Sequence, residues 1–234
     1  MHLPDGIVNN QISIGFMAVA VGFIIPSIIR LKQQLTKKIL IQKNQLALAD
    51  GPTAESTSNQ KLILSKCGRD RVWQMAMIGA LIFAMQMINF PVTNGTSGHL
   101  IGAVLAAVVL GPWAGLIAIS AVLAVQSLIF ADGGILALGA NIFNMGIVAS
   151  YGGWYFIKFL KSVKFPSAIA IIITAWFSVV VASFFCALQI GFSETASLSL
   201  IIPGMVKIHL LIGVGEAIIT LITLKVLRLK FYED

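Results

Sequence analysis

The chain has 234 residues, of which 58% are hydrophobic and only 11% are charged, and its mean hydropathy is +0.93. A single soluble domain of this length cannot hide so much apolar surface, so the composition excludes a water-soluble protein and indicates an integral membrane protein. The formal net charge is +7. In a membrane protein, basic residues concentrate on the cytoplasmic side, so this charge can be explained by the orientation of the chain. No nucleic-acid partner is needed to explain it.

The first six residues, Met1-His2-Leu3-Pro4-Asp5-Gly6, place a histidine second in the chain. The Met1 amine, the His2 amide nitrogen and one His2 ring nitrogen can chelate a divalent ion through a five-membered and then a six-membered ring. Pro4, Asp5 and Gly6 are typical of a turn, so this tip can fold back onto the chain. Because no basic region precedes the first apolar segment, we expect an uncleaved anchor with its N-terminus outside and Met1 retained.

Apolar segments follow at 13–30, 72–90, 99–111, 114–131, 137–157, 167–190 and 204–228. Since a span needs about 20 apolar residues, they predict an all-α, polytopic membrane protein of about seven transmembrane helices. The segment 99–111 would rise only about 20 Å as a helix, against a hydrocarbon core of about 30 Å. We therefore expect it to tilt, to continue past Gly111-Pro112-Trp113, or to be partly re-entrant.

Charge gives the orientation of these segments. With the N-terminus outside, every lysine and arginine except Lys207 falls on the cytoplasmic side, as the positive-inside rule requires, and the C-terminus is cytoplasmic. The outer loops hold acids at Asp5, Asp132 and Glu194. Residues 31–71 form the one sizeable polar stretch, which we interpret as a flexible cytoplasmic loop. The sequence thus predicts a single transmembrane domain over 1–234, in the inner (plasma) membrane.

Histidine occurs at three positions, His2, His99 and His209. His99 follows a polar, glycine-bearing stretch and lies on the same face of the membrane as the N-terminus, which makes it the candidate for a fourth metal-binding nitrogen. Four nitrogens in a plane suit Ni(II), Cu(II) or low-spin Co(II) better than tetrahedral zinc or oxygen-binding magnesium. The alternative is that His2 is a solvated terminus and His99 merely begins a helix.

Several separated motifs occur in one order: QMINFPV at 86–92, GTSGHL at 95–100, LGPW at 110–113, DGG at 132–134 and LGANIFNMG at 138–146. With the first six residues and the region from His209 to Glu216, they resemble the CbiM/NikM family, the substrate-binding membrane subunits of energy-coupling-factor transporters for cobalt and nickel. The resemblance implies that Ni(II) or Co(II) is the transported substrate, with no organic cofactor. It implies ligation by the Met1 amino nitrogen, the amide and ring nitrogens of His2, and His99.

The same resemblance implies partners. They are a transmembrane coupling subunit, ATPase subunits and, often, a small accessory membrane subunit. The sequence contains no Gly-x-x-x-x-Gly-Lys-[Ser/Thr] loop, so we predict that this chain is not an enzyme and that ATP hydrolysis occurs on the partners. Ala76, Ala80 and Ala84 recur every four residues and leave a smooth stripe that another helix can approach closely. In related subunits a similar pattern contacts the coupling subunit; packing within this subunit is the alternative.

Other polar residues are expected to support the loop over the metal rather than to bind the metal. Asn141 and Asn144 are spaced i, i+3 and share one helical face, where an unsatisfied amide in hydrocarbon would be costly, so we expect them to form hydrogen bonds between helices. The supporting candidates around the loop are Asp5, Asn94, Thr96, Ser97, Asn141 and Asn144. The polar residues other than Asp5 would act by orienting the ligands. Asp5 could instead offset the positive charge of the site, and its alternative role is only to form the turn.

His209 and Glu216 lie two turns apart on one face of the last predicted span. Ionisable residues inside a membrane are functional by default, and a relay is one interpretation of this pair. The other interpretation is that a buried carboxylate simply fixes helix packing. The sequence leaves both open.

A different class of protein also fits one motif. Gly95-Thr96-Ser97-Gly98 matches the Gly-x-Ser-Gly of rhomboid-like intramembrane serine proteases, with Ser97 as nucleophile and His209 as base. This alternative explains neither Met1-His2 nor the longer motifs. The two functions are separable, because Ser97→Ala should abolish a protease and largely spare metal uptake, whereas His2→Ala should do the reverse.

Overall fold

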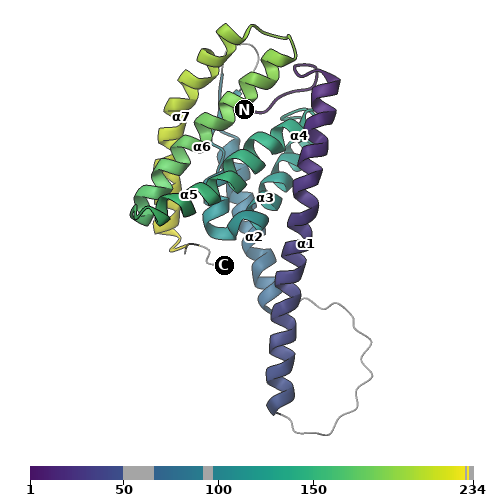
Figure 1. Ribbon diagram of the computed structural model, residues 1–234, viewed down its shortest axis with the longest axis vertical. Helices are drawn as coiled ribbons and strands as arrows, with labels where there is room; N and C mark the ends of the chain where they lie inside the picture. Colours follow the sequence, from purple (N-terminus) through teal and green to yellow (C-terminus); the bar gives the residue numbers. More distant parts are fainter. Residues whose placement is uncertain (50–65, 92–96, 230, 232–234) are drawn as a thin grey trace.

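The computed structural model describes residues 1–49, 66–91, 97–229 and 231, with the backbone alone described at 36–49, 66–67, 89–91 and 97. The described chain is all-α apart from two short strands (Figure 1). Its elements are α1 (Asn10–Ala49), α2 (Lys66–Gln86), β1 (Asn89–Pro91), β2 (Ser97–His99), α3 (Ala103–Ile129), α4 (Leu138–Asn141), the π-helix η2 (Ile142–Gly152), α5 (Gly153–Ser162), α6 (Ser167–Phe192) and α7 (Leu198–Val226).

Four helices among the described residues are long and apolar enough to cross a membrane. They are the stretch Asn10–Leu35 of α1 and the whole of α3, α6 and α7. This finding agrees with the multi-pass membrane protein that the composition indicates. The count of about seven spans stays a prediction.

The first part of α3 ends at a sharp break. At Gly111 the backbone leaves the helix with φ 76° and ψ 175°, and Pro112 begins the second part. Only glycine adopts such a φ readily. A Cβ on Gly115 would lie 3.2 Å from the main-chain carbon and oxygen of Ala106, so the two parts pack against each other across the break. The chain therefore breaks between the predicted segments 99–111 and 114–131 and changes direction abruptly there. The expectation that the short segment continues past Gly111 as one helix was wrong, because Gly111 leaves the helical region and Pro112 begins a new helix.

The expected cytoplasmic loop over 31–71 was wrong at both ends. The helix α1 continues to Ala49, beyond the rest of the bundle, and α2 already begins at Lys66 (Figure 1). The physical reason is that residues 31–49 are rich in Leu, Gln, Lys and Ala, which all have high helix propensity, so a polar composition did not mean a loop. Residues 50–65 lie outside the described residues, and the flexibility predicted for them remains untested.

The helix predicted over 72–90 ends early, at Gln86. The following residues form β1, which pairs antiparallel with β2 in the register Asn89↔His99 and Pro91↔Ser97. Pro91 explains the change, because proline disfavours helical backbone at the preceding residue and cannot donate a helical hydrogen bond. As a result His99 lies in a strand rather than at the start of a helix.

The N-terminal tail belongs to the hydrophobic core. Met1 and Leu3 are completely buried, and Val8 is 4% exposed. They join a cluster whose other members come mainly from α3, η2, α6 and α7. In Figure 1 the N-terminus lies inside the upper part of the bundle and the C-terminus lies near its lower end. The fold thus holds the first residues of the chain inside the protein.

Candidate metal centre

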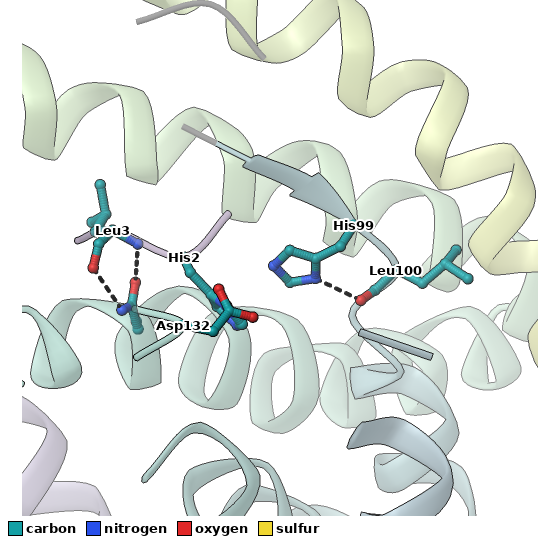
Figure 2. A network of polar contacts seen from close by, with 6 residues as sticks. His2, Leu3, His99, Leu100 and Asp132 are labelled. Carbon is teal, nitrogen blue, oxygen red and sulfur yellow. Dashed lines mark hydrogen bonds and ion pairs between the residues drawn. The ribbon is translucent and has the colours of Figure 1, made fainter. Parts of the chain in front are cut away.

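The tail is fixed by hydrogen bonds to its main chain. The Leu3 amide donates to Asn141 Oδ1 at 2.9 Å, and Asn141 Nδ2 donates back to the Leu3 carbonyl at 3.2 Å (Figure 2). The Gly134 amide also donates to the Leu3 carbonyl, at 2.8 Å. These contacts hold Leu3 on both of its backbone groups, so the two residues before it have a defined position.

Asp5 connects the tail to the start of α4. Its carboxylate accepts hydrogen bonds from the amides of Ile135, Leu136 and Ala137 at 3.0, 2.8 and 3.1 Å. Main-chain amides at the start of a helix favour such a negative partner. The turn expected from the sequence is present, since Gly6 has φ 89° and Asp5 bridges to Val8. Asp5 is therefore engaged by the loop before α4.

His99 presents one ring nitrogen to the interior. Its Nδ1 lies 2.7 Å from the Leu100 carbonyl, which can only accept, so Nδ1 carries the proton and Nε2 keeps its lone pair. His99 is completely buried, and Nε2 has no hydrogen-bond partner. The rings of His2 and His99 have centroids 4.3 Å apart at an interplanar angle of 49°. Two residues far apart in sequence thus share one buried position.

The segment that follows His99 is held by α2 and α7. Glu216 accepts hydrogen bonds from the amides of Ile101 and Gly102 at 2.8 and 2.7 Å. Gln86 Nε2 donates to the Ile101 carbonyl at 2.7 Å. Glu216 is thereby used as an anchor for the strand that carries His99, which is the structural one of the two interpretations left open by the sequence.

His209 is the third buried histidine. Its Nδ1 lies 2.7 Å from the Met205 carbonyl, and its Nε2 has no partner. His209 interacts electrostatically with His99 and with the Met1 amine. It therefore lies on the side of α7 that faces the candidate site. It lies two turns before Glu216, as the sequence predicts.

Burial changes the ionisation of the nitrogen groups in the tail and strand. It lowers the pKa of the Met1 amine from 8.0 to about 5, although the charges of Cys186 and Asp132 oppose the shift. Burial also lowers the pKa of His2, against its contact with Asp132. The pKa of His99 lies well below 6.5 because of burial first, and then because of the Met1 amine and His2. At neutral pH these groups are therefore uncharged, and each keeps one nitrogen lone pair.

Asp132 is the site residue that sequence reasoning missed. Its Oδ1 lies 2.9 Å from His2 Nδ1, without the alignment of a full hydrogen bond (Figure 2). The sequence identified Asp132 only as an acid in an outer loop and as part of the DGG motif. That motif, placed directly after a predicted span, was the available signal.

A metal at this position requires backbone nitrogens. Across the described part of the chain, no group of three or more His, Cys, Asp or Glu side chains is placed to hold a metal ion. The two rings of His2 and His99 supply a pair of side-chain nitrogens, and the Met1 amine and the His2 amide can supply two more. The geometry therefore suits the chelate expected from the sequence better than a side-chain cluster.

The remaining predicted residues fall into two groups. Asn144 pairs with Gln189 through both amide groups, at 2.8 and 3.0 Å, and so connects η2 to α6 rather than contacting the tail. Asn94 and Thr96 lie outside the described residues, and only the backbone of Ser97 is described. Their expected support of the metal loop stays a prediction.

Ala76, Ala80 and Ala84 are all exposed on α2. Ala76 and Ala80 line an apolar groove of about 600 Å³ that also includes Leu31 and Phe83. The stripe is thus open to the surroundings instead of being covered by another helix of this subunit.

Comparison with known proteins identifies the family. The family model described as "Cobalt uptake substrate-specific transmembrane region" matches residues 59–232. The chain belongs to the CbiM family. That match begins after the tail, so Met1 and His2, which are predicted to bind the metal, lie outside it.

Relatives of this CbiM family member are transport proteins. The chain is 41% identical over 146 residues to a putative fused nickel transport protein NikMN of Archaeoglobus fulgidus, covering 62% of the chain and 49% of that protein. It is 34% identical over 158 residues to a putative metal transport protein of Haloquadratum walsbyi, covering 67% of the chain and 72% of that protein. The chain thus spans about half the length of the fused relative.

A solved structure shares the fold. The crystal structure of a truncated transition metal transporter matches with a TM-score of 0.75 and 29% sequence identity. The match covers 97% of this chain and 99% of the other. Unlike the family model, it therefore extends over nearly the whole chain.

Proposed function

We propose that this chain is the substrate-binding subunit of an energy-coupling-factor transporter that captures Ni(II) or Co(II) at the outer face of the membrane and delivers it inward. One observation carries the proposal. The tail is inserted into the bundle so that the His2 and His99 rings lie 4.3 Å apart, beside a buried Met1 amine.

The proposed ligands are four nitrogens: the Met1 amine, the His2 amide, His2 Nδ1 and His99 Nε2. An amide nitrogen binds a metal only after it loses its proton, which a strongly Lewis-acidic ion in a planar field can enforce. Loss of that proton leaves the occupied site with a formal charge of about +1, and the carboxylate of Asp132 near His2 would offset it. Zinc and magnesium prefer other geometries or ligands, which favours nickel or cobalt.

The relatives support the choice of metal. The matching family model is named for cobalt uptake, and one relative is named as a nickel transport protein. Because the chain covers only part of that relative, the complete transport cycle is part of the proposal. The alternative of a rhomboid-like protease has no support, since the relatives reported above are named as transport proteins.

Energy would come from partner subunits. The sequence has no P-loop, so separate ATPase subunits would hydrolyse ATP, and a small accessory membrane subunit would complete the assembly. The exposed stripe Ala76, Ala80 and Ala84 supports contact with a transmembrane coupling subunit, because small side chains let helix backbones approach closely. The basic residues support an outer N-terminus and a cytoplasmic C-terminus in the inner (plasma) membrane.

The test is metal binding by purified protein with one alanine inserted between Met1 and His2. The insertion destroys the five-membered ring, so we expect at least a tenfold loss of Ni(II) and Co(II) affinity, about 1.4 kcal/mol. A matched control carries one alanine between Phe165 and Pro166, two exposed residues in the loop between α5 and α6. Unchanged affinity in the first variant would contradict the proposed ligands.

A further inference from the structure

The proposed chelate, on which this inference rests, requires one particular nitrogen of His2. The six-membered ring runs through the metal, the amide nitrogen, Cα, Cβ, Cγ and Nδ1. Nε2 lies on the far side of the imidazole, and its lone pair points away from the backbone. Only Nδ1 can therefore join the amide nitrogen on one metal ion, and the two ring nitrogens have distinct roles.

In the structure that same nitrogen faces Asp132. The distance from His2 Nδ1 to Asp132 Oδ1 is 2.9 Å, while His2 Nε2 is buried without a hydrogen-bond partner. His2 itself is 3% exposed, so water does not readily replace these contacts. The metal and the carboxylate thus compete for Nδ1, and the ring must change its orientation before the chelate can close.

The loop that carries Asp132 is fixed to the tail, so the ring can turn while the carboxylate stays. The Asp132 amide donates to the Gln126 carbonyl at 3.0 Å, and the Gly134 amide donates to Leu3 at 2.8 Å. Gly133, at φ 93°, lies directly against the stem of His2: a Cβ there would be 3.5 Å from His2 Cβ and 3.7 Å from Cγ. The absence of a side chain at this position leaves space beside the imidazole.

We infer that Asp132 is a positioning residue for His2. When metal binds, the proton on Nδ1 passes to the Asp132 carboxylate, and the imidazole turns about its side-chain bonds until Nδ1 faces the metal and Nε2 faces Asp132. The carboxylate then returns the proton to Nε2, and the Nε2–H group donates a hydrogen bond to Asp132. Metal-bound histidines almost always donate their other N–H to a carboxylate or carbonyl, which fixes the tautomer and makes the ligand more basic. The carboxylate would serve the metal-free and the loaded protein through different ring atoms.

The first test measures Ni(II) affinity of the purified full chain by competition with a chromophoric chelator. Asp132→Asn keeps the shape of the side chain but removes the carboxylate, and we expect a loss of roughly 10- to 100-fold. Asp132→Glu keeps a carboxylate and should retain higher affinity than Asp132→Asn. The control Glu194→Gln removes an exposed carboxylate in the turn that follows α6 and should bind as the wild type does.

The second test follows the His2 ring directly and would not respond to a merely structural role. With only three histidines in the chain, ring ¹⁵N signals can be assigned with His99→Gln and His209→Gln. Planar four-nitrogen Ni(II) is diamagnetic, so the loaded protein can also be observed. We expect the His2 proton on Nδ1 without metal and on Nε2 with Ni(II) in the wild type.

The outcomes separate this inference from the proposed function. If the wild type does not bind Ni(II), the proposed function fails and the inference fails with it. If the wild type binds, but Asp132→Asn binds equally well or His2 keeps the same tautomer on loading, only the role of Asp132 is overturned. Equal thermal unfolding midpoints for the wild type and Asp132→Asn exclude misfolding as the cause of a lost affinity.

Discussion

The end of the bundle around the tail differs from the exposed face of α2. Groups at the tail form hydrogen bonds and contacts within the protein, whereas the side chains on this face of α2 are not covered by it. At the tail, Leu3, Asp5 and the strand after His99 each have hydrogen-bond partners from distant parts of the chain. On α2, the alanine stripe is exposed, and the groove beside it is almost entirely apolar. The backbone around the tail is fixed and enclosed, whereas the face of α2 is open.

This difference indicates two kinds of binding. A small ion binds more tightly when the backbone that carries its ligands is fixed before it arrives, because each group that must be ordered on binding reduces the affinity. An apolar stripe of small residues gains little from the lipid but allows close packing of another helix. The comparison therefore predicts that changes at the tail affect metal binding and that changes on α2 affect assembly, with little effect of either on the other property.

The largest effect is expected for His99→Ala. It removes the one ligand supplied from outside the tail, and we expect Ni(II) affinity to fall by roughly 100-fold or more, about 2.7 kcal/mol. Isothermal titration of the purified protein measures this loss. Assembly with the proposed coupling subunit, measured by co-purification, should stay the same. A variant that loses both properties would break the proposed separation of the two regions.

The lowered pKa of the Met1 amine gives a second prediction. Because the pKa of the Met1 amine is lowered to about 5, the amine is already unprotonated at pH 7, and binding should release one proton, from the His2 amide. We expect affinity to fall about tenfold per pH unit between pH 7 and 5, and more steeply below 5, where the amine must also lose a proton. An exposed amine would keep its usual pKa of 8.0 and take part throughout this range.

Proton release during Ni(II) addition at pH 7, in weakly buffered solution, is the direct measurement. A value close to one proton per metal supports the buried amine and the amide ligand together. A value close to two would show that the tail is solvated before metal binds. A value near zero would exclude the amide nitrogen as a ligand.

On α2 we expect Ala80→Trp to weaken assembly with the coupling subunit at least tenfold, about 1.4 kcal/mol, because the bulky ring fills the groove where a helix would approach. Metal affinity should not change. The matched control is Val19→Trp, which places the same side chain at a residue of α1 that is 40% exposed. If the two variants assemble with the proposed coupling subunit equally well, the alanine stripe is not the docking surface.

The smallest effect on metal binding is expected for Glu216→Gln. The amide keeps one oxygen as an acceptor, so one of the two hydrogen bonds to Ile101 and Gly102 survives. We expect a loss of stability of about 1–3 kcal/mol, measured by thermal unfolding, and a change in Ni(II) affinity of less than about tenfold. Full loss of uptake with intact stability would instead favour the relay interpretation of Glu216.

Local patterns predicted a multi-pass membrane protein and the part of the candidate site that lies in the tail. Hydropathy depends on neighbouring residues, and it located the apolar part of α1, the two parts of α3, and the helices α6 and α7. The chelate depends on the adjacent residues Met1 and His2, so it too was visible in the sequence. The polar composition of residues 31–49 led to the prediction of a loop. Their helix propensity was the better guide, since these Leu- and Gln-rich residues continue α1 as a helix.

What the sequence could not supply are pairings between distant residues. Leu3 and Asn141 are 138 positions apart, and Ile101 and Glu216 are 115 positions apart. No periodic pattern records which distant amide a carboxylate will meet. For the same reason Asp132 was recognised as an outer acid, but its position 2.9 Å from His2 was not foreseen. The β1–β2 pair, which turns His99 inward, was missed because each strand has only three residues.

The break at Gly111 has a consequence for the basic residue Arg71. Where the first part of α3 stops, its last carbonyls lose their helical partners and form the negative end of a helix dipole. Arg71 Nη2 donates to the Leu110 carbonyl at 2.5 Å, and its Nη1 donates to Gln74 at 2.8 Å. Arg71, which the positive-inside rule predicts to be on the cytoplasmic side, therefore also caps the C-terminal end of the first part of α3. Because α3 is interrupted, Arg71 near the start of α2 can form an ion–dipole contact with the middle of α3.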